Sequence, residues 1–80
     1  MRTTELVLLG DLALVELDRA IALFPPFNSA HEGYAVLLEE VDELWEEVKG
    51  RAGPERIANM RKEAIQVAAM ALRFIHDVTP

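Results

Sequence analysis

Residues 29–49, SAHEGYAVLLEEVDELWEEVK, contain seven of the fourteen acidic residues of this 80-residue chain, and no lysine or arginine until the last position. Ser29 followed by Glu32 has the form of a capping box, in which each side chain bonds a free backbone N–H of the first helical turn. Gly50 stands where a left-handed helix C-cap favours glycine. These signals predict a helix over about residues 30–49.

Apolar and acidic side chains occupy different sides of this expected helix. The acidic side holds Glu40, Glu43 and Glu47, whose spacing of three and four residues places them on one helix face. Like charges at this spacing cost about 0.2–0.5 kcal/mol per pair, and the helix dipole disfavours anions near the C-terminal end. A face selected only for solubility would interleave lysines, so we expect a divalent-cation site here, with a solvated acidic face as the alternative. The apolar stripe is Leu37, Val41, Leu44 and Val48, widened by Tyr34, Leu38 and Trp45.

Two further helices are expected on either side of the acidic one. Residues 3–23 carry apolar side chains nearly all round the helix, and Pro25 ends it because the residue before a proline is pushed out of the helical region. Residues 54–77 form the other, with Pro54 suited to the first helical position. A helix this apolar in so short a chain indicates a subunit interface.

We therefore expect a single all-α domain over residues 1–80. The protomer would have three helices, and the second and third would pack antiparallel because their connection is short. A chain of this size buries only about 60% of its unfolded surface, although 51% of its residues are apolar. Oligomerisation would then complete a helical bundle.

Composition excludes several classes of protein. The net charge is −6, and the eight basic residues are scattered, which argues against nucleic-acid binding through a basic face. No apolar run reaches the roughly 18–20 residues of a membrane span. The N-terminal residues lack the cleavage site of a signal peptide. The absence of cysteine excludes disulfides and thiolate metal sites and is compatible with a cytoplasmic protein, which is our expectation.

A second group of candidate ligands lies on the third helix. In AIQVAAMAL, residues 64–72, Gln66 is the only polar side chain, and Glu63 lies three residues earlier on the same face. Gln66 is expected either to bond a neighbouring helix as a core amide or to offer its carbonyl oxygen to a cation. Facing pairs Glu40-x-x-Glu43 and Glu63-x-x-Gln66 would form an oxygen-rich pocket of the kind that Mg²⁺ or Mn²⁺ prefers.

This arrangement resembles the all-α nucleotide pyrophosphohydrolases of the MazG type. AHEGYAVLLEEVDELWEEVK followed by RKEAIQVAAMALRFI is similar to the family's E-x-x-E and E-x-x-D helices, and the resemblance covers residues 28–77. The EExxE half fits well. In the second half Gln66 replaces the usual aspartate, which keeps a carbonyl ligand and removes one negative charge from the site.

The resemblance implies a function and a set of residues. The family binds Mg²⁺ or Mn²⁺ and cleaves a (deoxy)nucleoside triphosphate to the monophosphate and pyrophosphate. Its members are dimeric or tetrameric, which implies a homodimer or homotetramer here. Carried over by motif position, the metal ligands are Glu40, Glu43, Glu63 and Gln66, with Glu39 beside Glu40 and Glu43 in the catalytic group. Arg61, Lys62, Arg73 or a second subunit would meet the phosphates, and Asn28 and His31 would contact base or sugar or serve only as loop and cap residues. The alternative function is a non-catalytic helical oligomerisation or regulatory module of the same fold.

Overall fold

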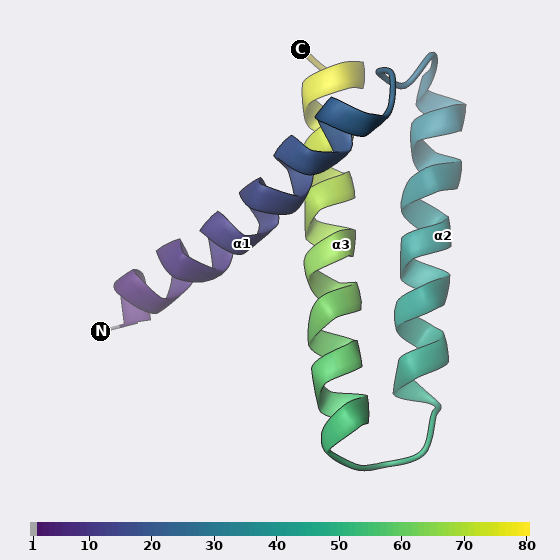
Figure 1. Ribbon diagram of the computed structural model, residues 1–80. Helices are drawn as coiled ribbons and strands as arrows, with labels where there is room; N and C mark the ends of the chain where they lie inside the picture. Colours follow the sequence, from purple (N-terminus) through teal and green to yellow (C-terminus); the bar gives the residue numbers. More distant parts are fainter. Residues whose placement is uncertain (1) are drawn as a thin grey trace.

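The computed structural model describes residues 2–80, which form three helices and, within that range, no strand. The helices are α1 (Arg2–Leu23), α2 (Ala30–Val48) and α3 (Pro54–Val78). The chain descends α2, turns through residues 49–53 and returns beside it along α3, while α1 leans away from this pair (Figure 1). The expected all-α class with three helices is confirmed.

The packing of α2 on α3 depends on a close approach at Gly33. Gly33 is buried in α2, and a Cβ built on it would lie 2.8 Å from Cδ2 of Phe74 and 3.0 Å from Cδ2 of Phe27. Two aromatic rings therefore rest directly on the helix backbone at this point. The sequence pattern did not indicate this role, because a glycine inside a helix normally only weakens it.

The two ends of α2 differ from the expected caps. Ser29 Oγ accepts the Glu32 N–H at 3.1 Å, as a capping box requires, but the Glu32 carboxylate accepts from the backbone N–H and the side chain of Asn28 instead of Ser29. The expectation of a left-handed cap at Gly50 is wrong, because such a cap needs a positive φ and among residues 2–80 only Gly53 has one. The Arg56 side chain instead donates to the last carbonyls of α2.

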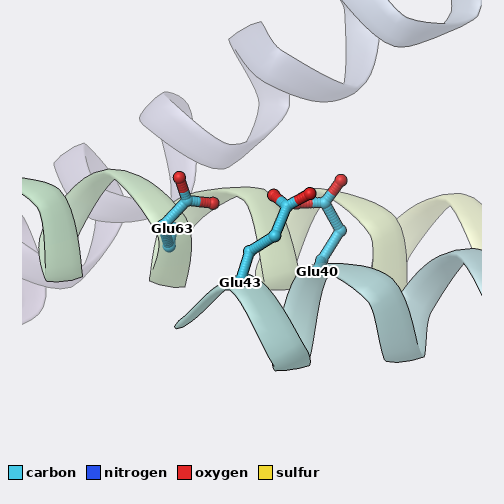
Figure 2. A group of neighbouring side chains, drawn as sticks. All are labelled: Glu40, Glu43 and Glu63. Carbon is cyan, nitrogen blue, oxygen red and sulfur yellow. The ribbon is translucent and has the colours of Figure 1, made fainter. Parts of the chain in front are cut away.

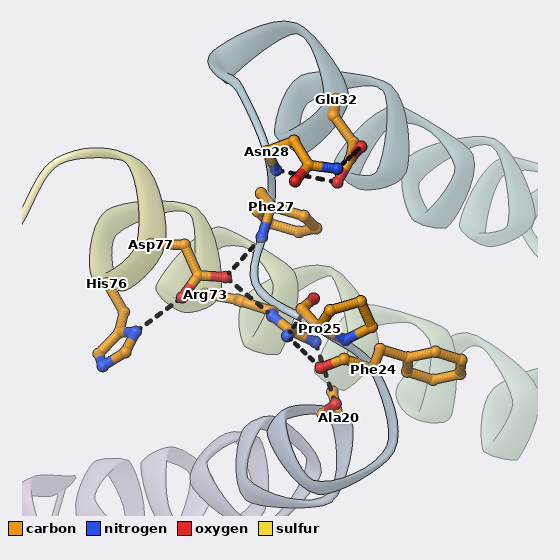
Figure 3. Close-up of polar contacts among 9 residues, drawn as sticks. All are labelled: Ala20, Phe24, Pro25, Phe27, Asn28, Glu32, Arg73, His76 and Asp77. Carbon is orange, nitrogen blue, oxygen red and sulfur yellow. Dashed lines mark hydrogen bonds and ion pairs between the residues drawn. The ribbon is translucent and has the colours of Figure 1, made fainter.

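The end of α1 is attached to α3 by a buried arginine (Figure 3). Arg73 is 3% exposed and donates to the carbonyl oxygens of Ala20, Phe24 and Pro25 at 2.8–3.0 Å. The Ala20 oxygen also accepts the Phe24 backbone N–H, whereas Phe24 and Pro25 lie just beyond the end of α1. The Asp77 side chain, also 3% exposed, accepts from Arg73 Nε at 3.0 Å and from the Phe27 backbone N–H at 3.1 Å. The cluster fixes the loop between α1 and α2 against α3.

The rest of α1 is largely uncovered. Within residues 2–80 it packs against α3 and not against α2, and Ala13 is its one buried residue. Apolar side chains along it, such as Leu8 at 60% and Val15 at 64%, are exposed in the protomer. In the described part of the chain, no helix is both long and apolar enough to cross a membrane.

Candidate metal centre

Three carboxylates from two helices converge on the side of the α2–α3 pair that faces α1. Glu40 and Glu43 project from α2 and Glu63 from α3, and Figure 2 shows the three carboxyl groups turned toward one another. One oxygen from each lies within 4.8 Å of the others. The spacing of three residues on α2 places Glu40 and Glu43 on adjacent turns of one face. The contact between α2 and α3 then brings Glu63 to them.

The electrostatics of this cluster show negative charge with little compensation. Burial raises the pKa of Glu40 above its ordinary value, and the carboxylates of Glu43 and Glu63 raise it further. The pKa of Glu63 is also raised, first by burial and then by Glu43, while the Lys62 ammonium acts in the opposite direction. A group with this many oxygens and too little positive charge is a favourable place for a hard cation.

Gln66, expected as the fourth ligand, is engaged by a residue of α1. Its Nε2 donates to the Glu16 carboxylate at 2.8 Å, and both side chains are half-buried. The core-amide expectation for Gln66 therefore holds for its nitrogen, while its carbonyl oxygen takes no part in that bond. Glu16 was missed by sequence reasoning. Its only signal was an acidic residue inside an otherwise apolar helix.

The residues expected at the phosphates separate into two groups. Lys62 and Arg61 line an open groove between α1 and α3, beside Glu16 and Gln66. They therefore lie one turn or less along α3 from Glu63. Arg73 has a different role in the structure, because its guanidinium already donates to three carbonyls and to Asp77 and is buried.

The residues expected at the base or sugar lie at the far end of α2. The side chain of Asn28 bonds Glu32, so it acts as a cap residue there. His31 is exposed beside Tyr34 and Phe74. Glu40 stands nine positions after His31 on α2, which is about 14 Å along the axis. Glu39, the remaining catalytic candidate, is exposed on α2, and its charge adds to the rise in the pKa of Glu40.

Comparison of the chain with protein-family models, with curated proteins and with solved structures finds no significant match. The resemblance to MazG-type enzymes therefore depends on the residues of the two motifs and on the cluster that they form.

Proposed function

We propose that this protein is a metal-dependent nucleoside triphosphate pyrophosphohydrolase. It would convert a (d)NTP and water to the (d)NMP and pyrophosphate in the cytoplasm, as part of nucleotide-pool housekeeping. The observation that carries the proposal is the convergence of Glu40, Glu43 and Glu63, with oxygens within 4.8 Å of one another, on two neighbouring helices. The resemblance of residues 28–77 to the MazG type supplies the reaction.

The chemistry of the donor set fits Mg²⁺ or Mn²⁺. Both ions prefer carboxylate, amide and water oxygens, and there is no cysteine to favour a softer metal. Glu40, Glu43 and Glu63 would hold the ion, with the carbonyl oxygen of Gln66 as a further ligand. When bound, the ion supplies charge neutralisation at the phosphate oxygens and lowers the pKa of water.

The other residues of the site have roles that follow from charge and position. Glu39 would accept a proton from the attacking water. The water oxygen would form a bond to the α-phosphorus while the bond from that phosphorus to the leaving pyrophosphate breaks. Lys62 and Arg61, in the groove beside Gln66, would pair with the distal phosphates. His31 and Asn28 would meet the base or sugar only if the nucleotide extends along α2.

We also propose that α2 and α3 form the antiparallel half of a helical bundle that other copies of the chain complete, as a homodimer or homotetramer. The support is the large exposed apolar area of the protomer, including most of α1. A bundle completed in this way would bury apolar side chains that a lone protomer leaves in water.

The activity is tested by measuring pyrophosphate release from a panel of common and oxidised nucleoside triphosphates in Mg²⁺ and in Mn²⁺. Glu43→Gln should abolish release, whereas Asp42→Asn, which removes one charge from the neighbouring position outside the cluster, should retain it. Titration of Mn²⁺ by calorimetry should show binding to the Asp42→Asn variant and none to Glu43→Gln. Absence of release across the whole panel would reject the proposal.

The second candidate is a non-catalytic helical oligomerisation or regulatory module. It is favoured by the extent of exposed apolar surface and by the bond that holds the Gln66 amide to Glu16. It predicts that replacing Glu40 and Glu43 together by Gln changes stability and no other property. Metal binding that disappears in that double variant would exclude this candidate.

A further inference from the structure

An exposed apolar stripe runs along α2 on the side opposite the acidic cluster. Leu38, Val41 and Trp45 each stand two residues before an acidic residue, Glu40, Glu43 and Glu47 respectively. Two residues correspond to about 200° around a helix, so the apolar and acidic sets face opposite ways. Tyr34 and Val48 extend the stripe at the same spacing, and all five side chains are exposed, Trp45 at 56%. The members of the α2 stripe are Tyr34, Leu38, Val41, Trp45 and Val48.

A matching stripe of smaller residues runs along α3. Gln66 and Arg73 bond residues of α1 and so mark the side of α3 that faces α1. Ala68 and Ile75 stand two residues after them, again about 200° around the helix. They therefore lie on the side away from α1, as the α2 stripe does on its own helix. The members of the α3 stripe are Ile57, Ala64, Ala68, Ala71 and Ile75, and we call the two stripes together the outer face.

The protomer exposes more surface than a chain of its mass normally does. Its accessible surface is 6037 Å² for 9.0 kDa. A compact monomer of this mass exposes roughly 4,900 Å², so the excess is on the order of 1,100 Å². A stable interface buries about 800 Å² on each partner. The excess is sufficient for one interface of standard size with a second chain, and the exposed side chains of both α1 and the outer face contribute to it.

The two stripes are complementary in size to each other. The α2 stripe is made of large side chains, and the middle of the α3 stripe consists of Ala64, Ala68 and Ala71. Large side chains pack best against small ones, because large against large overpacks the contact and small against small leaves voids. A surface that carries both stripes therefore fits a copy of itself turned by 180°, in which each α2 meets the other α3.

We propose that the outer face is the interface with a second copy of this chain, with the α2 stripe of each protomer packed on the α3 stripe of its partner. The two hairpins then form a four-helix bundle, with the acidic clusters on its outside, under each α1. This inference specifies one interface of the oligomer proposed above, through α2 and α3, and leaves α1 outside that interface. It rests on that part of the proposed function, but it does not depend on metal binding or catalysis.

The first test is the mass in solution of wild type and of two single variants, by size exclusion with light scattering. Wild type should elute at twice 9.0 kDa or a higher multiple. Leu38→Glu, in the outer face, should shift the mass toward one chain. Leu8→Glu, at a position on α1 that is more exposed in the protomer (60% against 40%), should keep at least two chains together. A wild-type monomer, or dissociation by Leu8→Glu and not by Leu38→Glu, would overturn the proposal.

The second test reports the pairing of helices and does not require a disrupted variant to fold. Leu38 and Ala64 lie equally far from the centre of the turn between α2 and α3 and so at the same height in the bundle. The chain has no cysteine, so Leu38→Cys and Ala64→Cys each introduce a unique thiol. Co-refolded and treated with a short thiol cross-linker, the mixture should give a mixed dimer in excess of either homodimer. Predominance of the Leu38→Cys homodimer would reject the α2-on-α3 arrangement.

The two tests also separate this inference from the enzymatic proposal. Cross-linking with no pyrophosphate release would leave the interface established and the activity rejected. Pyrophosphate release by a chain that remains monomeric would support the enzymatic proposal and reject the interface.

Discussion

Glu40 is the residue whose ionisation matters most to the candidate site. Burial and the carboxylates of Glu43 and Glu63 raise its pKa, so the folded protein holds the Glu40 proton more tightly than the unfolded chain. The resulting stability is present below the ordinary pKa of a glutamate and is lost as the pH rises through the raised value. At neutral pH without metal, the ionised cluster therefore destabilises the fold.

Replacing Glu40 by Gln should stabilise the metal-free protein at pH 7. Removing one i,i+3 repulsion with Glu43 is worth about 0.2–0.5 kcal/mol, or a rise in Tm of about 1–4 °C in a domain of this size. Thermal unfolding followed by circular dichroism measures the change. At pH 4, below the raised pKa of Glu40, the two proteins should differ by less; an equal difference at both pH values would show that charge is not the cause.

Arg73 is the residue on which the attachment of α1 depends. Arg73→Met should lower the free energy of unfolding by about 3–5 kcal/mol, because the buried Asp77 carboxylate loses the guanidinium that pairs with its charge and the carbonyls of Phe24 and Pro25 lose this donor. A domain of this size has roughly 4–12 kcal/mol in total, so the variant should be close to unfolded. Urea titration gives the value. Arg61→Met, at an exposed position on the same helix, should change it by no more than about 0.5 kcal/mol.

Asp77, the partner of Arg73, makes the stability of the protein depend on pH in the opposite direction to Glu40. Hydrogen bonds from His76, the Phe27 N–H and Arg73 lower its pKa and outweigh the effect of burial. Its contribution to stability is therefore present above the ordinary pKa of an aspartate and is lost as the pH falls through the lowered value.

At the scale of helices, two glycines test what packing adds to intrinsic helix propensity. Gly10 lies within α1 with no atom within 4 Å of a Cβ built on it, whereas the Cβ at Gly33 of α2 would meet Phe74 at 2.8 Å. Gly10→Ala should stabilise the protein by about 0.5–1 kcal/mol. Gly33→Ala gains the same propensity but overpacks the contact at a cost of about 1–3 kcal/mol, so it should be destabilising. Denaturant unfolding of both variants measures whether each change raises or lowers the free energy of unfolding. Stabilisation by Gly33→Ala would mean that the aromatic rings packed on Gly33 move aside easily.

At the scale of the whole molecule, stability should depend on protein concentration. If copies of the chain complete the fold, dilution dissociates them and lowers Tm, whereas the Tm of a monomer stays constant. Thermal unfolding across a hundredfold range of concentration measures this. Leu38→Glu should remove the dependence, and a constant Tm for wild type would indicate that the apolar surface is exposed in solution.

The sequence alone determined the helical elements, because the signals for them are local. The all-α class and three helices followed from the capping residue Ser29, from Pro25 and Pro54, and from apolar spacing. The pairing of Glu40 with Glu43 also followed from the sequence, since both lie on one helix face. Their approach to Glu63 was expected from the short connection, and the structure places the three together.

Tertiary structure alone decided the features that depend on contacts between residues distant in sequence. The burial of Arg73 under the end of α1, the bond between Gln66 and Glu16, and the close approach at Gly33 each join positions about 40–50 residues apart. Nothing in the local sequence distinguishes a basic residue that binds phosphate from one that caps a distant helix. Only the fold determines which carbonyls and carboxylates surround each side chain, because those partners come from other helices.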